Sequence, residues 1–564
     1  MKLQNKNDNA ANRKSYVGSI YNLGEKKAKQ DILQSIDTKW AKLHKDGYIH
    51  IHDLDAYGLT YNCLTFDLLN AFPYSDFDSL SVTKKIIGVF DFLKELFEKV
   101  GNEQSGGMAL ANFDNDLATI FTRLGVTYIE NEEIFGATMR NLILWCNNTH
   151  TRMGQTSYYV SFNIGLAEND FARFLAFTLI DEFYNAGDLV YKPNIIFKVA
   201  NGINRYEKDR NFDLYVKSLE CTSKKMIPTY LLCDCDMNKS CTPNNLSIMG
   251  CRTRVVDNLF GKKGAIGRSN IANISINLPR LAFDVLKDTE SKSREVQFDK
   301  LKEKWVAVAD ATTDILLDRF HKTCKQDAEL FPTNQKYGLF CKDINNHELK
   351  DIFKQGTLAI GFIGLSEMLD VVFGTKYWED EMIYSKAVEF VKFMRVYTDS
   401  KTKEHNLNFS LLATSGELIS GRFIDTDKKR FKSYVFSKGF YTNSFHVEVD
   451  SDIPAWKKIE TEGIFHQYCN GGCITYVELK EAPIGNPEGL SELIEIASNA
   501  GVHYLGFNFP KDVCAECSAS GTFDICPECK SSCTTRIRRV SGYLEIEDYF
   551  TKGKKNESSH RRSN

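Results

Sequence analysis

Two Cys-x-x-Cys pairs near the C-terminus are the strongest chemical signal in this chain. They are Cys514 with Cys517 and Cys526 with Cys529. Each pair can offer two thiolates from one tight turn, and four thiolates suit tetrahedral zinc in a closed structural site. Iron–sulfur ligation is the alternative, and Cys533 is a fifth candidate ligand. We therefore predict a four-cysteine zinc ribbon over residues 511–533.

A glycine shortly after these cysteines has chemistry that no other residue offers. Gly542 lies in Arg-Arg-Val-Ser-Gly-Tyr-Leu, residues 538–544. Because glycine has no Cβ, a radical at its Cα can flatten between the electron-donating amide nitrogen and the electron-withdrawing carbonyl. The missing Cβ also lets the backbone approach another group closely. Taken alone, the glycine indicates an ordinary turn.

Two histidines and a cysteine lie close together near the N-terminus. Tyr-Ile-His-Ile-His, residues 48–52, alternates as a strand does, which predicts His50 and His52 on one face. Cys63 follows one short loop later. The histidines belong either to a half-buried strand or to the wall of a pocket.

A second group of cysteines occupies residues 231–252. It comprises Cys233, Cys235, Cys241 and Cys251. Their spacing fits no common zinc pattern, so the first three are predicted to be free thiols or core residues. Cys251 follows Met249 and Gly250 and precedes Arg252 and Thr253.

Helices and strands must position these residues. Apolar residues recur at helical spacing over 84–100 and 301–320, which predicts two core-facing helices. Residues 440–449 alternate and predict a strand. The charged tail, residues 551–564, is predicted to be disordered, and residues 1–24 are predicted to be flexible.

Composition narrows the class of protein. A net charge of -3 gives no sign of direct nucleic-acid binding, which usually needs clustered Lys and Arg. No apolar run is long enough to cross a bilayer. Sixteen cysteines without a secretion signal indicate a reducing, cytoplasmic setting with metal binding and thiol chemistry.

Several motifs together resemble the class III, oxygen-sensitive ribonucleotide reductases. The C-terminal cysteines followed by Arg-x-Ser-Gly-Tyr, the His-Ile-His-Asp-Leu-Asp…Asn-Cys run ending at Cys63, and Met-Gly-Cys-Arg-Thr around Cys251 resemble that family. So do Asn270 and Asn277 before Leu-Pro-Arg, and Gly-Thr-Leu-Ala-Ile-Gly-Phe-Ile-Gly-Leu from residue 356. Thr-Ser-Gly-Glu, residues 414–417, departs from the family's Thr-Pro-Ala-Glu but keeps the Glu, and Cys473 stands where the family usually has His.

The resemblance implies a fold and a set of roles. The fold is a ten-stranded α/β barrel over residues 25–510, with a finger loop inside and a glycyl-radical loop, residues 534–550, entering from the C-terminus. Gly542 would store the radical, Cys251 would form the thiyl radical, and Cys63 would be the reducing thiol. The remaining expected contacts are Asn270 with formate or substrate, and His50, His52 and Met249 in the substrate pocket.

The resemblance also implies cofactors and partners. They are ribonucleoside triphosphate substrates, dNTP and ATP effectors, a radical-SAM iron–sulfur activating enzyme, and a second copy of the chain in a homodimer. Many family members begin with an ATP-cone domain, and residues 1–24 are too few to hold one, so we expect none there. The reductant is expected to be formate, with a thioredoxin-like dithiol protein as the alternative. Cys233, Cys235, Cys241 and Cys473 are candidate partner thiols for that alternative route.

Two other functions compete with this interpretation. One is a different glycyl-radical lyase, and the other is a zinc-ribbon binding protein built on an inert barrel. The near-neutral charge and the second set of cysteines at 63 and 251 argue against the binding protein.

Overall fold

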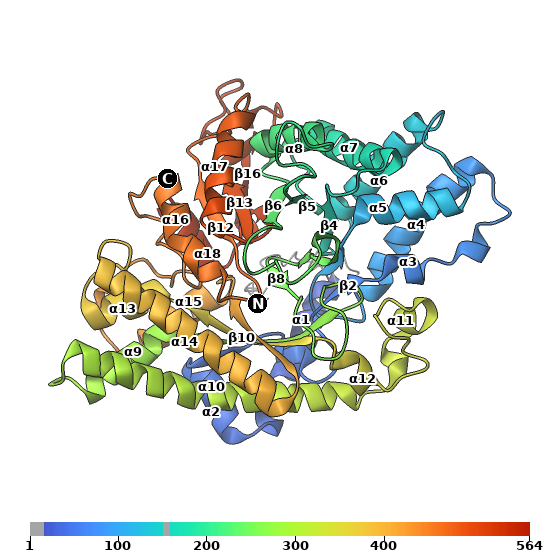
Figure 1. Ribbon diagram of the computed structural model, residues 1–564. Helices are drawn as coiled ribbons and strands as arrows, with labels where there is room; N and C mark the ends of the chain where they lie inside the picture. Colours follow the sequence, from blue (N-terminus) through green and yellow to red (C-terminus); the bar gives the residue numbers. More distant parts are fainter. Residues whose placement is uncertain (1–15, 151–157) are drawn as a thin grey trace.

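The sheet at the centre of this protein has ten strands along one path. The computed structural model describes residues 16–150 and 158–564 (Figure 1). The first five strands run parallel as β2 (Cys63–Phe66), β3 (Met108–Leu110), β4 (Val160–Ile164), β5 (Asn194–Val199) and β6 (Thr229–Leu232). The other five are β9 (Ser269–Asn277), β10 (Thr357–Ile363), β11 (Asn408–Ala413), β12 (Thr475–Glu478) and β13 (Tyr504–Asn508).

The two sets of five strands meet in antiparallel fashion and close the sheet into a barrel. β2 pairs with β9, and β6 pairs with β13, both antiparallel. The two ends of the path meet through one parallel bridge, Leu412 to Gly472. A further strand, β1 (Ile49–Ile51), pairs with the far half of β9. The ten-stranded α/β barrel predicted from the sequence is therefore confirmed.

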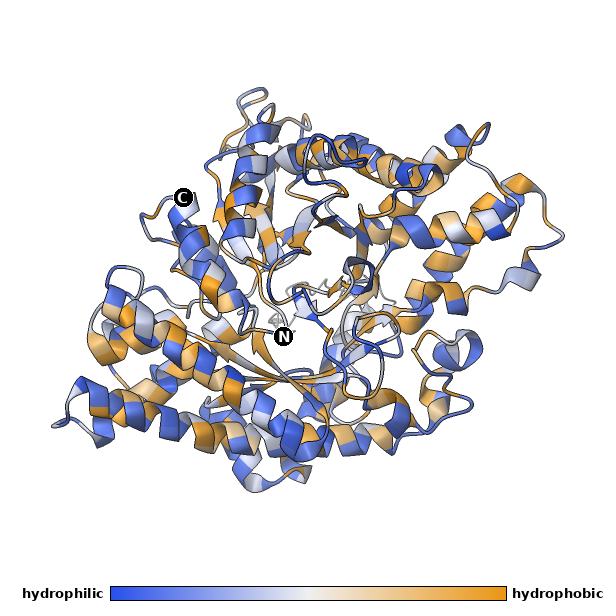
Figure 2. Cartoon of the chain, in the orientation of Figure 1, coloured by the Kyte–Doolittle hydropathy of each residue, from blue (hydrophilic) through white to orange (hydrophobic). Residues whose placement is uncertain are grey.

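Helices surround the barrel because parallel strands need long crossovers that return along the outside. The long ones are α4 (Val82–Val100), α6 (Glu132–Asn148), α7 (Asp170–Asn185), α8 (Phe212–Lys225), α10 (Arg294–Cys324), α14 (Glu381–His405), α16 (Ala455–His466) and α17 (Pro487–Asn499). Their apolar faces turn toward the strands, and polar residues cover much of the outside (Figure 2). α4 and α10 confirm the two helices predicted from apolar periodicity.

The remaining α-helices of the described residues complete the layer. They are α1 (Tyr16–Ser35), α2 (Thr38–Asp46), α3 (Leu68–Ala71), α5 (Phe113–Arg123), α9 (Leu278–Asp288), α11 (Pro332–Tyr337), α12 (Leu349–Phe353), α13 (Leu365–Phe373), α15 (Ile419–Asp427) and α18 (Lys552–His560). Among the helices of the described residues, none is long and apolar enough to cross a membrane.

A hairpin from the segment between β6 and β9 projects into the barrel, where β8 lies at the centre of the view (Figure 1). It consists of β7 (Ile248–Met249) and β8 (Thr253–Arg254), and we call residues 248–254 the finger loop. Arg252 Nη1 donates to Ala413 O at 3.2 Å, and Arg254 N donates to Gly471 O at 3.0 Å. The finger loop is thus bonded beside the bridge that closes the barrel.

A separate antiparallel sheet of four strands forms the C-terminal region. Its strands are β14 (Lys511–Cys514), β15 (Ser520–Gly521), β16 (Thr534–Arg539) and β17 (Leu544–Ile546). β14 carries Cys514 and pairs with β16. β16 turns into β17 through residues 540–543, where Val540 N donates to Tyr543 O at 3.0 Å. One sheet therefore joins the cysteine pairs to the turn that holds Gly542.

The tail is folded, and the prediction of disorder for residues 551–564 is wrong. The Thr551 side chain caps α18 by accepting from Lys554 N, and Lys554 and Glu557 form a buried ion pair at 2.6 Å. Gly553 packs against Gly421 of α15. Two of the charges that suggested a solvated tail, those of Lys554 and Glu557, instead pair with each other beneath the surface.

One other local prediction fails, and another is contradicted over the part of its range that the structure describes. Residues 440–449 alternate in sequence but form no strand, because buried turns stabilised by side chains, such as Tyr377 OH to Phe445 O at 2.5 Å, replace strand pairing. Within the predicted flexible segment 1–24, residues 16–24 belong to α1, and the rest lie outside the described residues.

Candidate functional site

Cys63 lies at the start of β2, inside the barrel and almost fully buried. Its Sγ donates to Asn62 Oδ1 at 2.8 Å and accepts from Gly107 N at 3.2 Å. Burial raises the pKa of this thiol well above its ordinary value. Cys63 is therefore held as a neutral thiol, which can give up a hydrogen atom.

Cys251 lies at the tip of the finger loop, between β7 and β8. Its Sγ is 3.2 Å from Ser415 Oγ. The residue keeps some exposure because it faces a cavity, while surrounding protein and the carboxylate of Glu417 raise the pKa of its thiol. Two neutral thiols, one on the barrel wall and one on the finger loop, thus face the same interior space.

Gly542 packs directly against the backbone of Cys251. A Cβ built on Gly542 would lie 1.5 Å from the carbonyl oxygen of Cys251 and 2.6 Å from its Cα. No larger residue fits unless one of the two loops moves. The structure therefore brings together two residues that the sequence places far apart, and glycine is required here for close approach.

Glycines also bring the other loops of the site into contact. A Cβ on Gly106 would lie 2.7 Å from Cys63 Sγ, and a Cβ on Gly107 would lie 2.9 Å from Gly250 Cα. The Gly-rich segment after α4 thus packs between Cys63 and the finger loop. Its function is close backbone packing beside the two thiols.

One carboxylate fastens the turn that contains Gly542. Ser541 Oγ donates to Glu417 Oε1 at 2.7 Å, and Tyr543 OH donates to Glu417 Oε2 at 2.9 Å. Burial raises the pKa of Glu417 to about 6, and these hydrogen bonds together with the charge of Lys554 oppose that rise. Both neighbours of Gly542 are therefore held by a single side chain from the barrel.

These groups line a cavity of about 260 Å³. That volume lies slightly below the range of roughly 300–1,000 Å³ that is usual for small-molecule sites. The lining residues that matter here are Cys63, Cys251, His52, Asn273, Tyr159, Lys192, Ser415, Glu417 and Tyr543. The cavity offers hydrogen-bonding groups and a lysine next to two thiols.

The other predicted pocket residues divide between lining and support. His52 lines the cavity, and its Nε2 is 2.8 Å from Ser275 Oγ. His50 is buried behind it, with the two rings edge to face at 4.7 Å. Met249 is fully buried in a small cluster with Cys63. His50 and Met249 are therefore absent from the cavity lining, although both contact residues that line it.

Asn270 lies opposite Cys63 in the β2–β9 ladder and is buried. Its amide nitrogen donates to Thr357 Oγ1 at 3.0 Å. Asn270 is not among the lining residues, whereas Asn273 on the same strand is. The side-chain amide oxygen of Asn273, Oδ1, is buried and accepts no hydrogen bond within the described parts of the chain.

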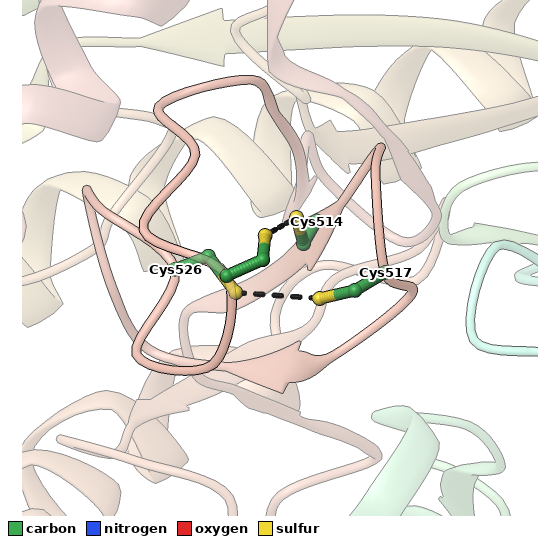
Figure 3. A group of neighbouring side chains, drawn as sticks. Cys514, Cys517 and Cys526 are labelled. Atoms are coloured by element: carbon green, nitrogen blue, oxygen red, sulfur yellow. Dashed lines mark hydrogen bonds between the residues drawn. The ribbon is translucent and has the colours of Figure 1, made fainter.

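The four cysteines of the two Cys-x-x-Cys pairs converge on one point (Figure 3). All four sulfur atoms lie within 4.8 Å of one another, and Cys514–Cys529 and Cys517–Cys526 are each 3.5 Å apart. Tetrahedral zinc with Zn–S bonds of about 2.3 Å would place its sulfurs roughly 3.8 Å apart. The cluster therefore fits a metal ion, and exposed Cys533 is not part of it.

The remaining candidate cysteines do not line the cavity. Cys233, Cys235 and Cys473 are buried, and Cys241 is partly exposed. Cys473 Sγ lies 3.2 Å from His466 Nδ1, within a buried polar network under β12.

Comparison with known proteins identifies the family of this barrel and its paired thiols. The family model "Anaerobic ribonucleoside-triphosphate reductase" matches residues 8–563. The chain therefore belongs to the anaerobic ribonucleoside-triphosphate reductase family. This result decides against both competing functions, a different glycyl-radical lyase and a zinc-ribbon binding protein.

Individual relatives agree with this assignment. The chain is 28% identical to the anaerobic ribonucleoside-triphosphate reductase of Escherichia coli strain K12, over 92% of this chain and 77% of the relative. A solved anaerobic ribonucleotide reductase shares the fold with a TM-score of 0.72 at 15% identity, over 97% of this chain and 88% of that one. The Thermotoga maritima enzyme, solved in complex with dATP and CTP, has a TM-score of 0.70 at 15% identity, over 96% of this chain and 90% of that one.

Sequence reasoning missed several residues of the site. Ser415, Asn273 and Tyr159 were not singled out, and Glu417 was noticed only as a retained motif residue. Ser415 carried a signal, since it is a departure from the family pattern immediately after a buried strand. Tyr159 and Asn273 carried none, because nothing in their local sequence separates them from other barrel residues.

Proposed function

We propose that this chain reduces ribonucleoside triphosphates to 2'-deoxyribonucleoside triphosphates by a radical mechanism. The observation on which the proposal rests is the contact between Gly542 and Cys251 beside a cavity that also contains Cys63. Gly542 stores the radical, Cys251 removes a hydrogen atom from the substrate, and Cys63 supplies reducing equivalents.

The chemistry explains why three such residues are needed. Hydroxide is a poor leaving group, so the ribose 2'-carbon resists direct reduction. Removal of the 3'-hydrogen as an atom leaves a neighbouring radical, which makes departure of the 2'-hydroxyl feasible. A buried, neutral Cys251 thiol suits this task, because a hydrogen atom rather than a proton is exchanged.

The site needs partners that the chain itself does not supply. A radical-SAM activating enzyme installs the radical at Gly542, and zinc occupies the four-cysteine cluster. Nucleotide effectors bind a homodimer of this chain; the Thermotoga maritima relative was solved with dATP and CTP. His50, His52 and Met249 shape the substrate pocket, with His52 on its lining and the other two behind it.

Formate is the proposed reductant. It requires one thiol opposite Cys251, and Cys63 fits that role. Asn270 would contact formate or substrate, which requires its amide to turn away from Thr357. The buried positions of Cys233, Cys235 and Cys473 outside the cavity favour formate over a dithiol protein.

The test is anaerobic incubation with the activating enzyme, CTP or ATP, and carbon-labelled formate. We expect a glycyl radical in the EPR spectrum, deoxynucleotide product, and labelled CO2 formed in step with it. Asn270→Ala should raise the formate concentration required. Full turnover with a thioredoxin-type reductant and no formate would replace formate in the proposal, and the absence of any deoxynucleotide would overturn the function.

A further inference from the structure

The loop between β11 and α15 contacts both members of the Cys251–Gly542 pair. We call residues 414–417, Thr-Ser-Gly-Glu, the 414–417 loop. Ser415 Oγ lies 3.2 Å from Cys251 Sγ. Two residues later, the Glu417 carboxylate accepts hydrogen bonds from the side chains on either side of Gly542. A single short loop therefore contacts the thiol and grips the glycine turn.

The 414–417 loop is itself firmly held by the barrel. Thr414 Oγ1 is 2.8 Å from Ser275 Oγ on β9, and Gly416 N donates to Asn443 Oδ1 at 2.6 Å. A Cβ on Gly416 would lie only 2.3 Å from that same Asn443 oxygen. These contacts fix the backbone between Ser415 and Glu417, so the two side chains are held at a set separation.

A third element is needed because the reacting groups come from different parts of the fold. Cys251 is on the finger loop, and Gly542 is on a hairpin of the C-terminal sheet. Atom transfer is efficient only when the reacting atoms are held about 3–3.5 Å apart and aligned, and errors of about 1 Å are costly. Two loops from separate sheets do not supply that alignment by themselves.

We propose that Ser415 and Glu417 are positioning residues that align the Cys251 sulfur with the Gly542 Cα for hydrogen-atom transfer. The inference rests on the proposed function for the identity of the two reacting groups. In the step, the S–H bond of Cys251 breaks and a Cα–H bond forms at the Gly542 radical, so one hydrogen atom moves and the radical passes to sulfur. In the reverse step the Cα–H bond breaks and the S–H bond re-forms, so the radical returns to Gly542 and no other reactant is needed.

The Ser415 contact depends on the side-chain hydroxyl that this chain has at residue 415. The similar family pattern, Thr-Pro-Ala-Glu, has proline at this position, and proline has no side-chain hydroxyl. The hydroxyl of Ser415 orients the Cys251 sulfur by a hydrogen bond that proline lacks. Glu417 keeps the second contact, which acts on the glycine turn.

Deuterium exchange at Gly542 measures the transfer without any substrate. In D2O the Cys251 thiol takes up deuterium, and each return transfer places deuterium on Gly542, which collapses the splitting that the α-hydrogen causes in the EPR signal of the activated chain. We expect Ser415→Ala to slow this collapse about fivefold, the effect of roughly one net hydrogen bond. Glu417→Gln, which cannot accept both hydroxyls in the same way, should slow it by about tenfold or more.

Matched variants separate positioning from general damage. Ser218→Ala removes a buried hydroxyl bonded to Tyr215 O, and Glu103→Gln alters a buried carboxylate bonded to Thr333 N, both outside the cavity lining. Both controls should exchange at the native rate. Ser415→Thr retains a hydroxyl and should recover most of the rate.

A second measurement needs no activation. Amide hydrogen exchange of peptides spanning residues 538–546 reports how firmly the glycine turn is held. Ser541→Ala and Tyr543→Phe each remove one donor to Glu417, so each should raise exchange in these peptides even if Glu417→Gln does not fold. Unchanged exchange in both variants would overturn the Glu417 half of the inference.

Failure of the inference and failure of the proposed function give different results. If the native chain exchanges deuterium but makes no deoxynucleotide, the function is wrong and the positioning stands. If it makes deoxynucleotide and the Ser415 and Glu417 variants exchange at the native rate, the positioning is wrong and the function stands.

Discussion

At the scale of single residues, Gly542 is the position least able to accept change. Gly542→Ala should abolish the radical signal, because its Cβ would meet the Cys251 carbonyl at 1.5 Å and crowd a planar radical. EPR of the activated protein checks this. A radical of normal yield in the variant would show that storage lies elsewhere.

Two assays, the glycyl radical signal and product formation, should distinguish the role of Cys251 from that of Gly542. Cys251→Ala removes the thiol but leaves the backbone against which Gly542 packs. We therefore expect a normal glycyl signal together with deoxynucleotide formation at background level. Continued reduction by this variant would contradict the role proposed for Cys251.

The pH dependence of turnover should report Glu417. Its pKa is raised to about 6 by burial, against hydrogen bonds from Ser541 and Tyr543 and the charges of Lys554 and Arg252. The ionised form accepts both hydroxyls, so product formation should fall as the pH drops from 7 to 5, and Glu417→Gln should lack this fall. The effect of Glu417 on folding stability has the opposite pH dependence. Because its pKa is raised in the folded state, Glu417 contributes stability below pH 4.5 that is lost as the pH rises through 6. A native profile that is flat between pH 5 and 7 would count against the charge state of Glu417.

The individual residues of the site were predictable to different degrees. The four clustered cysteines follow from local spacing, because each pair forms one turn. The contact between Gly542 and Cys251 has no local signature, since it depends on how a hairpin enters a barrel. Asn270 and Asn273 show the same limit, because strand alternation does not tell which of two nearby asparagines reaches a cavity.

At the scale of elements, the C-terminal sheet links the cysteine cluster to the glycine turn. Cys517→Ser should lower the metal content from about one zinc per chain and reduce the yield of glycyl radical with it, because β14 and β16 are paired. Metal analysis and EPR on the same samples test this. Cys533→Ser, outside the cluster, is the control and should change neither. A full radical yield in metal-free protein would show that the glycine turn does not depend on the cysteine cluster.

Helix α18 should contribute to stability through its contact with α15. A side chain at residue 553 would press on the backbone of Gly421 at 2.6 Å. Gly553→Val should therefore lower the free energy of unfolding by about 1–3 kcal/mol, the usual cost of overpacking. Denaturant titration checks this, with Gly187→Val as the control because nothing lies within 4 Å of a Cβ there.

Helices and strands were predictable where the apolar residues of a segment recur with a single period. α4 and α10 follow from apolar spacing, and β1 follows from alternation around His50. The predictions of a disordered tail and of a strand at residues 440–449 were wrong, because composition and alternation describe only local preference. Tertiary contacts, a buried Lys554–Glu557 pair in one case and buried turns in the other, override that preference.

At the scale of the whole molecule, oxygen should cut the activated chain near one point. A carbon radical reacts with oxygen, so exposure should cleave the backbone at Gly542 and release a short C-terminal fragment. Mass spectrometry would identify it, and unactivated protein exposed to the same oxygen should stay intact. Cleavage elsewhere would place the radical on another residue.

The barrel as a whole was predictable only through its family likeness. Apolar runs reveal buried strands, but strand order depends on contacts between distant segments. The antiparallel junctions of β2 with β9 and β6 with β13 have no signature in either strand alone.

The closure of the barrel has a mechanical consequence. Between β11 and β12 the wall has a seam around the bridge from Leu412 to Gly472, where Ala413 N donates to Gly472 O at 3.0 Å and Gly471 N donates to Leu411 O at 2.8 Å. Arg252 and Arg254 bond to Ala413 and Gly471 on opposite sides of that seam. The finger loop therefore links the two sides of the seam, and any movement of β11 relative to β12 also displaces the Cys251 sulfur. The position of the Cys251 thiol therefore depends directly on the rigidity of the barrel.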